Sequence, residues 1–190
     1  MNTPDPTITH SPEVTSLLNG DVIVYPTEAV YGMGCDPQNE LAVLKLLKIK
    51  QRPIEKGLIL IANDYGQLLK FVDDKKIPMD KRTDIISRWP GPTTWLLPAA
   101  PDAPKWITGQ HDLIAVRVTD HPTVKRMCKE FGGAIVSTSA NVTGQPTITD
   151  VATLALQFSD QVGYIVDEPL GGYDQPSTII NSFTGEVVRT

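Results

Sequence analysis

Apolar residues recur along the chain at two different spacings, which predict helices that alternate with strands. Leu41, Leu44 and Leu47 lie on one face of a helix, whereas apolar side chains take every second position from 114 to 118. Gly and Pro residues separate such segments. Helices are predicted over residues 11–20, 39–50, 64–72, 80–88, 122–132 and 150–158. Strands are predicted over residues 21–25, 57–62, 93–97, 114–118, 134–137, 164–166, 178–180 and 186–188.

The alternation of strands with helices favours an α/β fold, in which helices cover a sheet. The 190 residues match the size of one domain, and the sequence has neither an internal repeat nor a dividing linker. We therefore expect one domain over residues 1–190, with residues 1–10 loose. Ligands of such sheets bind in loops beyond the strand ends, so candidate chemistry is sought there.

Composition narrows the class of protein. Hydrophobic residues make up 41% of the chain and charged residues 21%, which is typical of globular proteins and not of disordered, collagenous or coiled-coil chains. The longest apolar run, residues 58–62, is far shorter than the roughly 20 residues of a membrane-spanning helix. The net charge of −5 argues against a domain built mainly to coat nucleic acid. The N-terminus resembles no secretory signal, so we expect a cytoplasmic protein without a membrane partner.

Polar segments border several predicted strands, at residues 26–34, 48–53, 137–144 and 175–179. Each segment has a purely structural interpretation. Gly32 and Gly34 suit a turn better than a dinucleotide fingerprint, because the third glycine of that fingerprint is missing. The cations of residues 48–53 suit a helix C-terminus, and the Ser and Asn residues of 137–144 suit a turn.

Metal-ligand residues are too few or too scattered to predict a resident metal site. The histidines show no ligand spacing, and the two cysteines suit small buried apolar positions. Two cysteines are also too few for a disulfide framework or a four-ligand zinc site. These residues are His10, His111, His121, Cys35 and Cys128.

The same polar segments also favour an anionic ligand. Lys50, Arg52 and Lys56 supply positive charge, and Ser139 and Asn141 add neutral hydrogen-bond donors. Arg presents a planar fork that matches phosphate or carboxylate oxygens, while Lys supplies a point charge. Together, such groups can stabilise charge that moves during phosphoryl or nucleotidyl transfer.

Arg117 lies opposite the apolar face of the strand predicted over residues 114–118. A buried cation there needs an anionic partner, which is either a substrate carboxylate or an acidic side chain of the protein itself. The sequence lacks a Gly-x-x-x-x-Gly-Lys-Ser/Thr loop, the protein-kinase motifs and a Gly-x-Ser-x-Gly elbow. A nucleotide would therefore bind through a different arrangement.

Taken in series, six segments resemble the YrdC/TsaC family of threonylcarbamoyl-AMP synthases. They extend from about residue 20 to the C-terminus, and the chain length resembles the short bacterial form of the family. The segments are YPTEAVYGMGCDP at 25–37, LLKIKQRPIEKGLILIA at 46–62, RWPGPTTWLLPA at 88–99, AVRVTDHP at 115–122, VSTSANVTGQP at 136–146 and PSTI at 176–179.

This resemblance implies a fold and a reaction. The expected fold is a twisted open sheet of mixed strands, flanked by helices, with a deep basic cavity. The expected reaction converts L-threonine, bicarbonate or CO₂, and ATP with Mg²⁺ into threonylcarbamoyl-AMP and pyrophosphate. A separate tRNA threonylcarbamoyl transferase complex would then modify N6 of adenosine 37 in tRNAs that read codons beginning with A. Weak tRNA binding by the chain itself is compatible with this function.

The resemblance also implies roles for individual residues. The expected ATP contacts are Lys50, Arg52, Lys56, Asn141 and Arg189. The expected threonine contacts are Thr27, Arg117, Ser139 and Ser177. The residues expected to act in catalysis are Lys50, Arg52, Ser139 and Asn141. No metal ligand is assigned, although Glu28 is the nearest acid of these motifs and a candidate for the threonine ammonium or a metal-bound water.

Two other functions fit the same residues. An RNA-binding module could use the basic cavity to hold tRNA or double-stranded RNA, with an affinity that falls steeply with salt. A regulatory protein could bind the nucleotide without turning it over. Pyrophosphate release that requires threonine separates the synthase from both.

Overall fold

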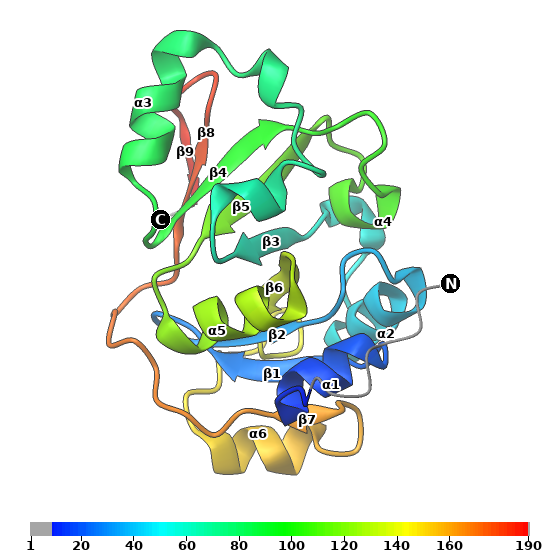
Figure 1. Ribbon diagram of the computed structural model, residues 1–190. Helices are drawn as coiled ribbons and strands as arrows, with labels where there is room; N and C mark the ends of the chain where they lie inside the picture. The colour runs from blue at the N-terminus through cyan, green and yellow to red at the C-terminus, as the bar shows by residue number, and fades with distance from the viewer. Residues whose placement is uncertain (1–8, 190) are drawn as a thin grey trace.

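An open, mixed sheet runs through the described part of the chain, residues 9–189 of a computed structural model (Figure 1). Among these residues nine strands are ordered β7-β1-β2-β6-β3-β5-β4-β8-β9. Parallel pairs are β1 with β7, β3 with β5, and β4 with β8, and the other neighbours are antiparallel. The strands are β1 (Ile23–Pro26), β2 (Tyr31–Gly34), β3 (Ile59–Ala62), β4 (Thr93–Pro98), β5 (Leu113–Val118), β6 (Ile135–Ser139), β7 (Tyr164–Ile165), β8 (Thr178–Asn181) and β9 (Val187–Arg189). The predicted open sheet of mixed strands is therefore confirmed.

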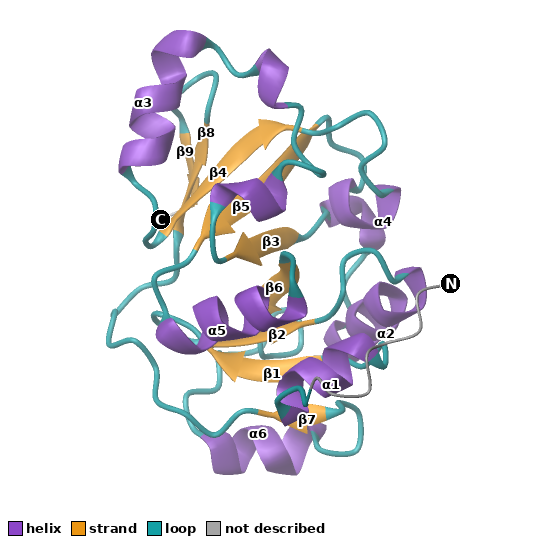
Figure 2. Ribbon diagram, in the orientation of Figure 1, coloured by secondary structure: helices purple, strands orange, loops and turns teal. Residues whose placement is uncertain are grey.

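Short helices surround this sheet (Figure 2). The α-helices are α1 (Pro12–Leu18), α2 (Glu40–Lys50), α3 (Met79–Ser87), α4 (Lys105–Thr108), α5 (Pro122–Phe131) and α6 (Val151–Phe158). The 3₁₀ helices are η1 (Ile54–Lys56), η2 (Tyr65–Leu68) and η3 (Asp74–Lys76). Within residues 9–189, the helices are too short or too polar to cross a membrane.

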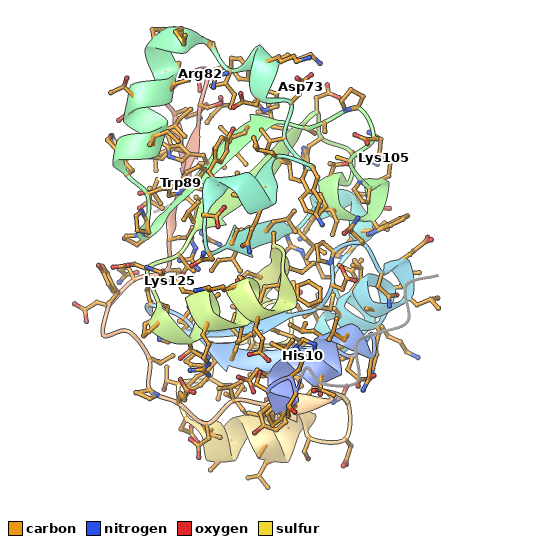
Figure 3. The ribbon with its side chains drawn as sticks, in the orientation of Figure 1. His10, Asp73, Arg82, Trp89, Lys105 and Lys125 are labelled. Atoms are coloured by element: carbon orange, nitrogen blue, oxygen red, sulfur yellow. The ribbon has the colours of Figure 1, made fainter. Side chains whose placement is uncertain are left out.

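Side chains fill the space between the helices and the sheet (Figure 3). The main hydrophobic cluster joins α2 and α4 to β2, β3, β5 and β6, and includes Leu46, Ile107 and Val116. A second cluster joins α1 and α5 to β1, β3 and β6, and includes Leu17 and Met127. The sheet is therefore packed against helices through these two clusters.

The first residues of the described chain are attached to α5. The His10 imidazole lies 3.5 Å from the Glu130 carboxylate, and the backbone N–H of Ser11 donates to the same oxygen at 2.5 Å. Figure 3 labels His10 beside α1 and α5. Of the segment 1–10 that we expected to be loose, residues 1–8 lie outside the described chain, and His10 lies beside Glu130 of α5.

Several predicted boundaries were wrong. Residues 31–34 form a strand, whereas we interpreted residues 26–34 as a loop and the two glycines as part of a turn. The helix predicted over 64–72 is only the 3₁₀ turn η2, whose N-cap Asp64 accepts the N–H of Gln67. The strand predicted over 134–137 continues to Ser139, because Thr138 and Ser139 pair with β2. Helix α4 was not predicted at all.

Candidate functional site

A polar cavity of about 190 Å³ opens where the β1–β2 turn, the end of β6 and strand β5 come together. That volume is roughly what six water molecules occupy in the liquid. The loop before β8 and strand β9 complete its wall. Its lining residues are Thr27, Glu28, Ala29, Val30, Gly32, Arg52, Leu58, Ile59, Pro92, Arg117, Ser137, Thr138, Ser139, Thr147, Gln175, Pro176, Ser177 and Arg189.

The β1–β2 turn brings Thr27 and Glu28 to this cavity. The Thr27 hydroxyl donates to the carbonyl of Val30 at 2.7 Å, which closes the turn. Strand β2 then runs close to β6. A Cβ on Gly34 would come within 2.0 Å of the Val136 carbonyl oxygen, so only glycine fits there. The Gly-Met-Gly sequence therefore serves close strand packing and not dinucleotide binding.

Arg117 and Glu28 form a buried ion pair at the cavity wall. The Arg117 Nη1 lies 3.0 Å from the Glu28 Oε2, and both side chains are nearly inaccessible to solvent. The other carboxylate oxygen of Glu28 accepts from the Thr119 hydroxyl at 2.7 Å and from the N–H of Asp120 at 3.2 Å. Burial alone raises the pKa of Glu28, but the charge of Arg117 and these hydrogen bonds outweigh it and hold that pKa below its ordinary value.

This pair decides between the two partners we considered for Arg117. The protein itself supplies an anion, so the guanidinium is held in place before any ligand arrives. Arg117 also lines the cavity, because it shares a strand face with Leu113 and Ala115 and that face borders open space. Both members of the ion pair, Arg117 and Glu28, therefore border the space open to a ligand.

Arg52 and Arg189 meet neutral acceptors instead. Arg52 donates from Nε and Nη2 to the carbonyl oxygen of Gly57, at 3.3 and 3.0 Å. Arg189 donates from Nη2 to the carbonyl oxygen of Ser177 at 3.0 Å and to its hydroxyl at 3.3 Å. Burial lowers the pKa of Arg189, and the charges of Arg117 and Arg52 lower it further. These guanidinium groups thus lie close enough to repel one another.

The loop that carries Arg52 is held by the turn after α4. The N–H of Leu58 donates to the carbonyl of Ile107 at 2.8 Å, and the N–H of Gln110 donates to the carbonyl of Glu55 at 3.2 Å. Gly109 has a φ of +61°, and a Cβ there would come within 2.4 Å of the Glu55 carbonyl oxygen. A glycine at this turn therefore allows the two loops to pack backbone against backbone.

Hydroxyl groups line the remaining wall. Ser137 and Ser139 take alternate positions on β6, and the Ser177 hydroxyl lies 2.8 Å from that of Thr94. Neither Ser137 nor Thr94 was among the predicted site residues, although Ser137 begins the polar segment 137–144. Alternation along a strand could have found Ser137, whereas Thr94 comes from β4, 83 residues from Ser177 along the chain.

Lys50 and Asn141 lie behind this wall. The Lys50 ammonium donates to the backbone carbonyl oxygens of Ser139 at 2.5 Å and Asn141 at 2.7 Å. The Asn141 amide donates to the carbonyl oxygens of Gln145 at 2.6 Å and Val142 at 3.2 Å. Burial lowers the pKa of Lys50 to about 8, and the nearby charge of Arg52 adds to the effect.

A larger, more apolar cavity of about 570 Å³ adjoins the first one. Its volume falls within the roughly 300–1,000 Å³ that is typical of ligand pockets. The two cavities share Arg52, Leu58, Ile59 and Arg189 as lining residues. Lys56 lines only the larger one, together with apolar residues of β3, β4, β5 and β8.

The structure thus brings all nine predicted site residues to one region. Six of them line the polar cavity among the described residues, one lines the larger cavity, and two support the wall from behind. These are Thr27, Arg52, Arg117, Ser139, Ser177 and Arg189, then Lys56, and finally Lys50 and Asn141.

The acidic groups near the cavity do not form a cage for a divalent metal. Among residues 9–189, no three His, Cys, Asp or Glu side chains gather closely enough to hold an ion. Glu28, the one acid of the described polar-cavity lining, is engaged by Arg117 and Thr119. A metal ion at this site would therefore depend on ligand oxygens.

Fold and site together define a class of protein. An open α/β sheet carries the polar cavity (the polar chamber from here on), whose described lining holds three arginines and one acid, next to the larger and more apolar cavity (the larger chamber). The chain matches the model of the Sua5/YciO/YrdC family, described as "Telomere recombination", over residues 15–190. The chain belongs to this family.

Close relatives share nearly the full length of the chain. It is 65% identical to the threonylcarbamoyl-AMP synthase of Pseudoalteromonas translucida, over 93% of this chain and 94% of that protein. It is 48% identical to the threonylcarbamoyl-AMP synthase of Klebsiella pneumoniae, over 99% and 97% of the two chains.

A solved structure supports the same fold. Sua5 from P. abyssi, in complex with L-threonine, matches with a TM-score of 0.82 and 30% identity. The match covers 89% of this chain but 49% of that one, so this chain spans about half the length of Sua5.

Proposed function

We propose that this protein is an L-threonylcarbamoyladenylate synthase, a nucleotidyl-transferring enzyme of the cytoplasm. The observation that carries the proposal is the charge of the polar cavity. Arg52, Arg117 and Arg189 lie close together, and Glu28 is the one acid among the described lining residues. The excess positive charge suits a ligand that brings several negative charges, and the relatives named threonylcarbamoyl-AMP synthase support ATP as that ligand.

Threonine fits the polar chamber. A chamber of about 190 Å³ with hydroxyl-bearing walls has room for one small amino acid. Arg117 would bind the threonine carboxylate, and Glu28 would face its ammonium. Thr27, Ser139 and Ser177 lie around the same space and would bind its polar groups. The threonine complex of P. abyssi Sua5 supports this amino acid as the substrate.

ATP would lie across the wall that the two chambers share. Arg52 and Arg189 border both chambers, so they can contact phosphate oxygens, with Lys56 beyond them. The larger chamber has the volume and apolar lining for the nucleoside. Mg²⁺ would arrive with the triphosphate, because phosphate oxygens can supply ligands that the protein lacks.

The proposed reaction needs alignment more than acid–base catalysis. The threonine ammonium first releases a proton to solvent, and the free amine then combines with bicarbonate, losing water, to give N-carboxy-threonine. An oxygen of the new carboxylate then attacks the α-phosphorus of ATP. The bond from the α-phosphorus to the α,β-bridging oxygen breaks, and the β- and γ-phosphates leave together as pyrophosphate. An ionised carboxylate requires no protein base. The guanidinium groups would hold two anions together and offset their repulsion.

The product is a mixed anhydride, so a second enzyme must accept its threonylcarbamoyl group. We propose that a tRNA threonylcarbamoyl transferase complex takes it to adenosine 37 of tRNAs that read codons beginning with A. Weak tRNA contacts by this chain would be compatible with that transfer. The polar chamber is too small for an RNA strand, so the RNA-binding alternative gains no support from it.

One assay tests the proposal. Purified protein is incubated with ATP, Mg²⁺, bicarbonate and threonine, and pyrophosphate and the adenylate product are measured. We expect pyrophosphate release that requires both threonine and bicarbonate and that drops sharply when serine or valine replaces threonine. Release that is absent, or that does not depend on the amino acid, would overturn the proposal.

A further inference from the structure

We propose that Lys50 is a positioning residue, whose buried ammonium fixes the turn after β6 and so shapes both chambers without contacting a substrate. The inference rests on the proposed function for its ligands, threonine and ATP. It replaces the direct phosphate contact that we had expected for Lys50.

The contacts of Lys50 are all to the protein backbone. Its side chain is 2% exposed, and its ammonium donates to the carbonyl oxygens of Ser139 and Asn141 at 2.5 and 2.7 Å. In return, the N–H of Thr143 donates to the carbonyl oxygen of Lys50 at 2.9 Å. Lys50 thus binds the turn at both of its ends, through its side chain and its main chain.

This turn carries a group of the polar chamber. Ser139 lines the chamber, and its carbonyl oxygen accepts both from Lys50 and from the N–H of Asn141 at 2.9 Å. The carbonyl of Tyr31 accepts the N–H of Ala140 at 2.8 Å, which ties the same turn to β2. A shift of the turn would move Ser139 away from a bound threonine.

The backbone of Lys50 also begins the loop that carries Arg52. Helix α2 ends at Lys50, and Gln51 adopts a left-handed conformation with a φ of 50°. The N–H of Arg52 then donates to the carbonyl of Leu47 at 3.0 Å. One residue therefore connects the threonine side of the site, through Ser139, with the nucleotide side, through Arg52.

Burial also separates Lys50 from the ligand space. Arg52 and Ser139 line the polar chamber, whereas Lys50 is absent from the described lining of both chambers. Carbonyl dipoles, and not a carboxylate, face its charge. The lowered pKa of Lys50, caused by burial and then by Arg52, agrees with an ammonium that has no anion beside it.

Substitutions separate positioning from phosphate binding. Lys50→Met removes the ammonium, and we expect affinity for threonine alone and for ATP alone each to fall at least about tenfold. A phosphate contact would lower affinity for ATP only. Lys50→Arg adds a second distinction, because Arg binds phosphate well but its wider fork does not fit between the two carbonyls. We expect Lys50→Arg to weaken the binding of threonine and of ATP as well.

Two variants provide controls. Lys48→Met removes a lysine from the same helical turn, but that side chain is exposed, so both affinities should stay within twofold of the wild type. Arg52→Met should weaken the binding of ATP and leave the affinity for threonine within twofold of the wild type. Binding is measured by calorimetry with each ligand alone. Amide hydrogen exchange of residues 139–143 is measured in parallel and should accelerate in Lys50→Met.

The outcomes of these measurements test whether Lys50 positions the turn or contacts phosphate. Loss of ATP affinity only, or rescue of ATP binding by Lys50→Arg, would overturn the inference. If the wild type binds neither ligand, the proposed function fails, while faster exchange at 139–143 in Lys50→Met would still support positioning. If the variants do not fold, a wild-type crystal structure with threonine and an ATP analogue decides. The Lys50 ammonium should remain on the two carbonyl oxygens, and its movement to a phosphate oxygen would contradict the proposal.

Discussion

Arg117 and Arg189 line the same chamber, but their charges are met in different ways. Arg117 lies 3.0 Å from the carboxylate of Glu28, whereas Arg189 donates to the neutral carbonyl and hydroxyl of Ser177. Arg52 resembles Arg189, since its acceptor is the carbonyl of Gly57. The chamber thus contains one guanidinium whose charge the protein balances and others whose charge it leaves to a ligand.

This difference suggests separate tasks. A buried ion pair fixes the geometry of Arg117, which suits selection of a small amino acid whose own charges sum to zero. Guanidinium groups without a carboxylate repel each other, and an anionic ligand relieves that repulsion. Arg52 and Arg189 are therefore suited to the triphosphate, and the experiments below are designed to separate the two kinds of arginine.

Loss of Arg52 should have the largest effect. Arg52→Ala removes a cation that would stabilise charge moving toward the leaving pyrophosphate, so we expect kcat/KM for ATP to fall roughly 100- to 1,000-fold. The pyrophosphate assay measures it. Arg88→Ala is the matched control, because that arginine pairs with Asp84 on the surface. An equal loss in the control, or an unfolded Arg52 variant, would contradict this role.

Loss of the Glu28 carboxylate, the partner of Arg117, should lower the free energy of unfolding. Glu28→Gln leaves the buried guanidinium without an anion, and we expect the free energy of unfolding at pH 7 to drop by about 3 kcal/mol. Because the folded pKa of Glu28 lies below its ordinary 4.5, this stabilisation is complete above pH 4.5 and is lost as the pH falls through the folded value.

Denaturant unfolding of wild type and Glu28→Gln between pH 7 and pH 3 checks that sign. The difference in free energy should stay constant from pH 7 to about pH 5 and shrink at lower pH. A difference that grows toward acid, or that is absent at neutral pH, would show that Glu28 does not stabilise Arg117.

The affinity for ATP should depend more strongly on salt concentration than the affinity for threonine. The Debye length falls from roughly 10 Å at 0.1 M salt to 3 Å at 1 M, so attraction between unbalanced cations and a triphosphate weakens. We expect affinity for ATP to fall several-fold more than affinity for threonine over that range. Calorimetry at four salt concentrations gives both slopes, and equal slopes would remove the distinction between the arginines.

Lys56 should show the smallest effect. Its side chain is exposed at the larger chamber, where a contact with phosphate is worth about 0–1 kcal/mol. We expect Lys56→Ala to lower the affinity for ATP by no more than about fivefold. A loss as large as that of Arg52→Ala would place Lys56 among the central phosphate contacts instead.

Local sequence signals predicted the elements whose causes are local. Asn39 before α2 and Asp150 before α6 each accept an N–H three residues later, and both helices lie within the predicted ranges 39–50 and 150–158. Strand β2 was missed, because its glycines reflect contact with Tyr25 and Val136 and not their own backbone preference. Such contacts depend on the complete sheet.

The site likewise has features that local sequence predicts and features that depend on the folded chain. Residue types and the family resemblance predicted that the cations and hydroxyl groups converge. The partner of Arg117 could not be chosen from sequence, since Glu28 is 89 residues away and reaches it only through the β1–β2 turn. Likewise, the sequence could not show that Lys50 turns toward the backbone of Ser139. The two residues are 89 positions apart along the chain and meet only in the folded protein.

Affinities of two variants for the two ligands test the central claim, that Arg117 selects the amino acid while Arg52 and Arg189 bind the nucleotide. Calorimetry should find that Arg117→Met weakens threonine at least tenfold more than ATP, and that Arg189→Met does the reverse. Equal losses of both ligands in both variants would contradict the claim.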